Sequence, residues 1–202
     1  MLVHGLWNTG LEATLLRFRL AAQGFEVRQF HYRTITALMH EVLGALRAAV
    51  LELPSPVHLV GHSLGGLVIL RLLDEHPELP IGRVVLLGSP VNGSAAARAA
   101  VQMPGAALLF GELADAELVR PEARRWQHPF EIGLIAGSQP ISFARMFHRL
   151  PEPNDGTVTV DETRLEGATE HLVLPVSHIS MLFAPSVVTA TASFLRTGRF
   201  SG

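Results

Sequence analysis

The sequence GHSLG at residues 61–65 fits the pattern G-x-S-x-G. A short apolar run at 57–60 precedes it, and an apolar segment with helical periodicity follows at 64–75. In that setting the serine sits on a sharp strand-to-helix turn, with its hydroxyl projecting from the sheet and flanking glycines relieving the crowding that a Cβ would create. The pattern therefore predicts Ser63 as a nucleophile, and the alternative is a glycine-rich turn with an idle serine.

A serine nucleophile needs a general base, and ten histidines are available for that role. His178 follows the last predicted strand, at 172–174, where a loop can reach over the strand ends. His171 begins that strand, at the wrong end of the sheet, and His58 lies inside a core strand. We therefore predict His178 as the base, with an ordinary loop histidine as the alternative.

The base needs an acid that holds its tautomer and stabilises the imidazolium. Of the four aspartates, Asp155 alone falls in a loop after a predicted strand, at 132–136. The chain order Ser63, Asp155, His178 matches the Ser…Asp…His order of hydrolases. Asp155 could instead be a turn residue or a helix N-cap. Glu152 is the nearest substitute for the acid.

Acyl transfer also needs two backbone N–H groups aimed at the position where negative charge develops. The residue after the nucleophile, Leu64, should supply one of them. The loop after the first short strand, at 1–3, should supply the other through Leu6. His4 and His62 adjoin these donors, and we expect both to orient their loops through hydrogen bonds.

Short β-like runs alternate with longer helical ones, which favours an α/β fold with a mostly parallel sheet and helices on both faces. We expect strands at 1–3, 25–30, 57–60, 84–87, 132–136 and 172–174, and helices at 9–23, 35–51, 64–75, 157–165 and 179–195. Active sites of such sheets lie beyond the carboxyl ends of the strands. The segment 92–130 is too long for one crossover helix, so we interpret it as a small helical cap-like insertion near the site.

Composition bounds the remaining possibilities. The chain has 202 residues, 48% of them hydrophobic, and a net charge of −2, which suits one domain over 1–202 and no nucleic-acid partner. All 16 basic residues are arginine and there is no cysteine, so lysine Schiff bases, thiol nucleophiles and disulfides are excluded. Neither a membrane-spanning run nor a signal peptide is visible, which favours a cytoplasmic location unless a leader was removed.

These motifs resemble the α/β-hydrolase superfamily, and within it small bacterial lipases and esterases. HGLW, GHSLGG, NDGTV and VSHISM follow one another in the lipase order, from residue 4 to residue 181. The resemblance implies a triad of Ser63, Asp155 and His178, with Leu6 and Leu64 as oxyanion-hole donors. It also implies an α/β-hydrolase fold with reduced N-terminal strands.

The chain departs from these lipases beside the expected site. Trp7 stands where many lipases have a small residue, and Trp7, His62 and Met181 are predicted to contact the substrate. Some members of the superfamily bind calcium, but four aspartates, one of them in the triad, provide no calcium site here. We expect no metal and no cofactor.

The predicted reaction is hydrolysis of a carboxylic ester with an apolar acyl group through an acyl-enzyme. The substrate is expected to be a small-molecule or lipid ester, with transient contact to a lipid surface, and the oligomeric state stays open. Acyl transfer or thioester hydrolysis by the same triad is the main alternative. An amidase or peptidase and a non-catalytic binding domain of the same fold are further alternatives.

Overall fold

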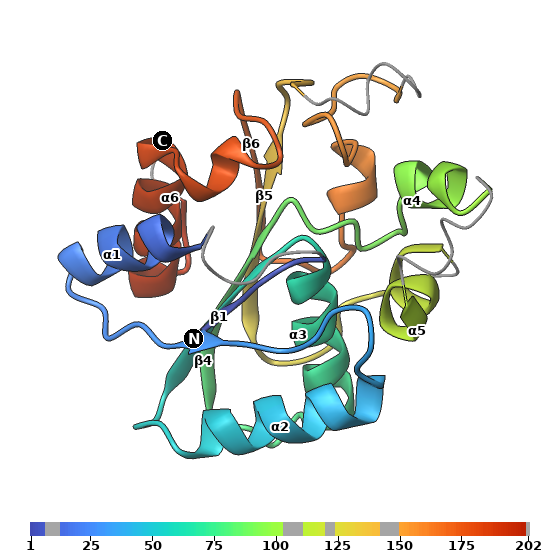
Figure 1. The fold of residues 1–202 in the computed structure, drawn as a ribbon. Coiled ribbons are helices and arrows are strands. Elements are labelled where there is room, and N and C mark those ends of the chain that lie inside the picture. Colours follow the sequence, from blue (N-terminus) through green and yellow to red (C-terminus); the bar gives the residue numbers. More distant parts are fainter. Residues whose placement is uncertain (7–12, 103–110, 120–123, 142–149, 201–202) are drawn as a thin grey trace.

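The computed structural model describes residues 1–6, 13–102, 111–119, 124–141 and 150–200. In this part of the chain six strands form one sheet, in the order β2-β1-β3-β4-β5-β6 (Figure 1). All neighbouring strands are parallel. Their bounds are β1 Leu2–Val3, β2 Gln29–Phe30, β3 Val57–His62, β4 Ile81–Leu87, β5 Glu131–Gly137 and β6 Glu170–Leu174.

Helices cover both faces of this sheet, as predicted (Figure 1). One face carries α1 (Thr14–Ala22) and α6 (Pro185–Thr197), and the other carries α2 (Met39–Leu51) and α3 (Leu64–Glu75). The short elements are α4 (Ala95–Ala100), α5 (Gly111–Ala114), the π-helix η2 (Asp115–Val119) and the 3-10 turns η4 (Asp161–Thr163) and η5 (Ser180–Leu182).

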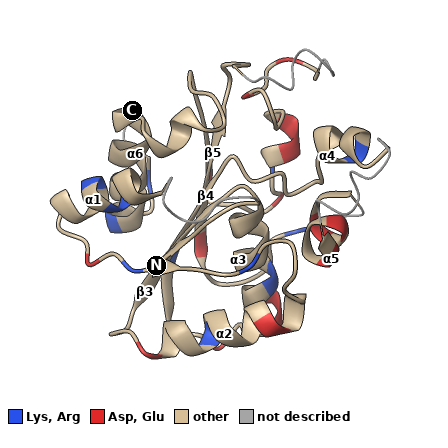
Figure 2. Ribbon diagram, in the orientation of Figure 1, with Lys and Arg blue, Asp and Glu red and all other residues tan. Residues whose placement is uncertain are grey.

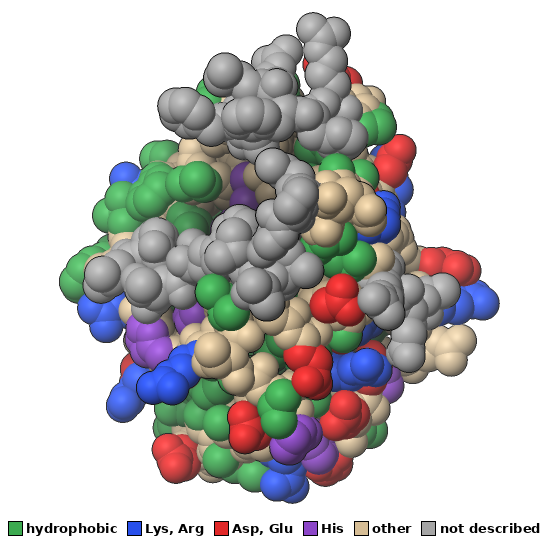
Figure 3. All heavy atoms as spheres, turned by 45° about the vertical axis from the view of Figure 1, so that its right-hand side comes forward, with side chains coloured by type: hydrophobic (Ala, Val, Ile, Leu, Met, Phe, Trp, Pro, Cys, Tyr) green, Lys and Arg blue, Asp and Glu red, His purple; other side chains and the backbone are tan. Residues whose placement is uncertain are grey.

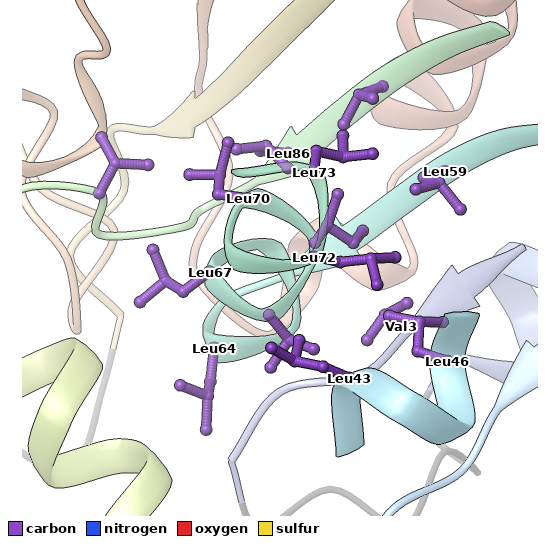
Figure 4. Close-up of a cluster of buried hydrophobic side chains, with 14 of the residues drawn as sticks. Val3, Leu43, Leu46, Leu59, Leu64, Leu67, Leu70, Leu72, Leu73 and Leu86 are labelled. Carbon is purple, nitrogen blue, oxygen red and sulfur yellow. The ribbon is translucent and has the colours of Figure 1, made fainter. Parts of the chain in front are cut away.

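Two apolar cores follow from the alternation of side chains along the central strands. Leu86 points to the core shared with α2 and α3, whereas its neighbour Leu87 points to the core shared with α1 and α6. Helix α3 is buried almost all round, because the sheet, α2 and η2 surround it (Figure 4). Each fully buried leucine contributes about 1.5–3 kcal/mol, so these cores fix the strand ends that bear the site.

Some predicted elements differ from the structure. The strand expected at 25–30 is only Gln29–Phe30, because its neighbour β1 offers just two residues for pairing. The helix expected at 157–165 is only the turn η4. Here Asp155 Oδ1 accepts hydrogen bonds from two backbone N–H groups, and Glu162 Oε2 accepts one from Thr159. Such side-chain bonds compete with helical ones.

The predicted insertion at 92–130 contains α4, α5 and η2, and its residues 103–110 and 120–123 lie outside the described residues. Glu117 of η2 is buried and pairs with Arg124 at 2.6 Å and with Arg71 of α3 at 3.5 Å. The pair with Arg71 attaches the insertion to α3. No helix within the described ranges has the length and apolar character needed to cross a membrane.

Candidate active site

Ser63 occupies a strained turn between β3, which ends at His62, and α3, which begins at Leu64. Its φ of 54° and ψ of −124° make it the one non-glycine residue with positive φ among those described. Such a conformation costs on the order of 1–3 kcal/mol and persists only where the surroundings enforce it. The Ser63 N–H donates to the Leu87 carbonyl at 2.9 Å, which ties the turn to β4.

Glycines allow the close packing that enforces this turn. A Cβ added at Gly61 would lie 2.5 Å from Gly66 Cα, and one added at Gly65 would lie 2.3 Å from the Val3 carbonyl oxygen. Both distances are far below van der Waals contact, so only glycine fits at these two positions. The first turn of α3 therefore packs directly on β1 and β3.

His178 and Asp155 form a buried hydrogen-bonded pair. The His178 Nδ1–H donates to Asp155 Oδ2 at 2.7 Å, and the Asp155 side chain is 1% exposed. Asp155 Oδ1 accepts the N–H groups of Thr157 at 2.9 Å and Val158 at 2.7 Å. With Nδ1 protonated, the other ring nitrogen of a neutral His178 is free to accept a proton.

The sheet brings the predicted site residues together at the carboxyl ends of its strands. A Cβ added at Gly88, just past β4, would lie 3.2 Å from both Asp155 Oδ2 and His178 Nδ1. One added at Gly5, just past β1, would lie 2.9 Å from Ser63 Cβ. The ends of β1, β3 and β4 thus meet the loops that follow β5 and β6.

The predicted oxyanion donors flank Ser63. Leu64 is the first residue of α3, where N–H groups have no intrahelical acceptor. Leu6 follows Gly5, whose backbone approaches Ser63 closely. An oxyanion hole formed at these positions would take its two backbone donors from two different elements.

Tyr32 supports the loop after β1 and was missed by the sequence analysis. Its hydroxyl donates to the His4 carbonyl at 2.8 Å, and its ring stacks on His4 at 4.6 Å between centroids. Burial raises the pKa of the Tyr32 hydroxyl, so it stays protonated and remains a donor. Its place directly after β2, at the carboxyl end of a parallel strand, was the available signal.

Two of the three residues predicted to contact the substrate are buried. Met181 is fully buried in the core beside α6. His62 is 6% exposed and its Nε2–H donates to the His178 carbonyl, so it lies beneath the site. The sequence analysis did not predict that these two side chains are buried. Trp7 lies outside the described residues.

Metal-ligating residues do not gather in threes anywhere in the ranges that the structure describes.

The predicted alternatives for the acid and the base lie elsewhere. Glu152 is exposed, and His171 Nε2 contacts Thr163 Oγ1 at 2.8 Å on β6.

A family model described as the alpha/beta hydrolase family matches residues 1–193. The chain belongs to this family. No curated protein sequence matches the hydrolase.

Solved structures of lipases and esterases share its fold. The mature form of the Bacillus licheniformis lipase BlEst2 is 20% identical with a TM-score of 0.75, over 98% of the hydrolase and 91% of that chain. The propeptide form of the same lipase is matched over half its length, with a TM-score of 0.72. The metagenomic carboxyl esterase MGS0156 is 19% identical with a TM-score of 0.60, over 88% of the hydrolase and 63% of that chain.

Proposed function

We propose that this hydrolase cleaves carboxylic esters with Ser63 as nucleophile, His178 as general base and Asp155 as the acid that orients it. The observation that carries the proposal is the 2.7 Å His178–Asp155 hydrogen bond, together with the bond from His62 to the His178 carbonyl, since His62 directly precedes the serine held at positive φ. The lipase and esterase activities of structural neighbours support the same reaction class.

The reaction proceeds in two steps through an acyl-enzyme. His178 accepts the Ser63 proton while the serine oxygen attacks the ester carbonyl, and the N–H groups of Leu6 and Leu64 stabilise the oxyanion. Asp155 stabilises the imidazolium that forms, because its carboxylate already accepts the Nδ1–H. His178 then protonates the leaving alcohol, and water releases the acid by the same route.

The surroundings of the base favour an apolar ester at a lipid surface. Ile179 and Phe183, on the loop after His178, expose 66% and 38% of their surface. Arg19 of α1 donates to the Phe183 carbonyl, which brings the exposed Leu15 and Phe18 of α1 to the same side of the molecule. The basic residues of α1 are seen in Figure 2. Hydrophobic side chains also border a hollow in which a histidine is visible (Figure 3).

A series of p-nitrophenyl esters, from acetyl to palmitoyl, tests the proposal with wild type and Ser63→Ala measured side by side. We expect turnover by the wild type, loss of nearly all of it in Ser63→Ala, and an unchanged fold by circular dichroism. The preferred acyl length distinguishes an esterase from a lipase. Equal turnover by both proteins would refute Ser63 as the nucleophile.

Acyl transfer by the same triad is tested in that assay by adding an alcohol acceptor and analysing the products. Ester formation at the expense of free acid would favour a transferase over a hydrolase. A folded wild type that neither turns over esters nor reacts with a fluorophosphonate at Ser63 would instead favour a non-catalytic binding domain.

A further inference from the structure

The residue before the nucleophile contacts the main chain of the base. His62 ends β3, and its Nε2–H donates to the His178 carbonyl at 3.0 Å. The two imidazole rings lie 4.8 Å apart between centroids, tilted by 44°. His62 and Ser63 are adjacent in the chain, so this bond links the nucleophile's strand directly to the loop that carries the base.

The other ring nitrogen of His62 has no partner. Nδ1 is buried without a hydrogen bond, and His62 lines a small cavity of about 10 Å³ beside His4 and Leu182. An unpaired buried acceptor costs about 1–3 kcal/mol, and an apolar side chain would avoid that cost. Burial also lowers the pKa of His62 to about 3, so the ring is neutral and its one proton is committed to His178.

Both main-chain polar groups of His178 are hydrogen-bonded. Its N–H donates to the Asp155 carbonyl at 2.9 Å, and its carbonyl accepts from His62. Its Nδ1–H is held by the Asp155 carboxylate. Asp155 thus fixes the base from the β5 side, and His62 is the corresponding contact from the β3 side.

We infer that His62 is a positioning residue, whose Nε2–H fixes the His178 backbone and so sets where the base stands relative to Ser63. The inference rests on the proposed function for its kinetic consequences. His62 touches no substrate in this arrangement and exchanges no proton. A displacement of about 1 Å in a catalytic group can cost about 10²-fold in rate, which sets the scale of the expected effect.

Two substitutions separate positioning from core packing. His62→Leu removes the donor and fills the space. The substitution removes one unpaired acceptor, Nδ1, but leaves the His178 carbonyl without its donor. The unfolding midpoint should therefore stay close to that of the wild type. His62→Gln restores a side-chain N–H donor, and the glutamine Nε2 is as many bonds from Cβ as the histidine Nε2. The matched control is His171→Leu, which removes a partly buried histidine of β6 that does not contact the base.

We expect kcat to fall about 10–100-fold in His62→Leu, with KM within about threefold of wild type, and to recover most of its value in His62→Gln. His171→Leu should match wild type. Unchanged kcat in His62→Leu would overturn the inference. Equal losses of kcat in both His62 variants, in proportion to their losses of stability, would also overturn the inference. Core packing alone would explain that result.

A second readout does not depend on ester turnover. In protein labelled with ¹⁵N-histidine, the proton between His178 and Asp155 should give a low-field NMR signal in wild type and His62→Gln. The signal should broaden or shift in His62→Leu, and an identical signal in all three proteins would overturn the inference. If the wild type cleaves no ester, the proposed function fails while this measurement still decides the role of His62.

Discussion

Acid should destabilise the protein through His62, because burial keeps this imidazole neutral in the folded state. Burial lowers the pKa of His62 from its ordinary 6.5 to about 3. Between those pH values the unfolded chain binds a proton there that the folded chain does not, so stability is full above pH 6.5 and is lost as the pH falls. The free energy of unfolding should decrease by about 1.4 kcal/mol per pH unit in this range.

From pH 7.5 to pH 5 this decrease amounts to about 2 kcal/mol. Glutamine does not titrate, so the difference in unfolding free energy between wild type and His62→Gln should change by that amount over the interval. Burial also lowers the pKa of His58 and of His171, but both histidines are present in the two proteins and their effects cancel.

Urea unfolding followed by tryptophan fluorescence measures this difference at a series of pH values. The slope of free energy against urea concentration should be the same for both proteins, which indicates a shared unfolded state. The unfolding free energy of the wild type should fall relative to that of His62→Gln as the pH falls. Parallel curves from pH 7.5 to pH 5 would refute the reasoning, since they would mean that His62 takes up its proton equally in both states.

Two further substitutions address the acid and the turn. Asp155→Asn should lower kcat by about 10⁴-fold, because an amide N–H facing Nδ1 favours the wrong tautomer of His178. Exposed Glu152→Gln should not change kcat, and the reverse outcome in ester kinetics would move the acid to that residue. Gly65→Ala should lower the free energy of unfolding by about 1–3 kcal/mol or more, because its Cβ would lie 2.3 Å from the Val3 carbonyl oxygen; urea unfolding equal to wild type would contradict this packing argument.

The sequence predicted the parallel sheet and the sheet edge at which the candidate site lies. Alternating apolar runs indicate the strands, and one rule places functional residues past their carboxyl ends. The rule could identify Ser63, Asp155 and His178 without any knowledge of contacts, because each of them comes after a predicted strand. The described structure brings their loops together as the rule predicts.

The directions of individual side chains could not be predicted in the same way. His62 and Met181 looked like substrate contacts because of their neighbours in the chain, yet tertiary packing turns both inward. Tyr32 acts on a loop 28 residues away, and no local pattern encodes that contact. The short turn η4 replaced a predicted helix because Asp155 and Glu162 accept the backbone N–H groups that a helix would have used.

The sheet order also determines when a newly made chain can acquire its reactive centre. Ser63 leaves the ribosome early and directly follows strand β3 in the middle of the sheet, whereas Asp155 and His178 belong to loops after β5 and β6. Domains generally fold as units, so the nascent chain carries a serine without its base until those last strands have paired. The proposed nucleophile therefore lacks the histidine and aspartate of the proposed triad until the end of synthesis.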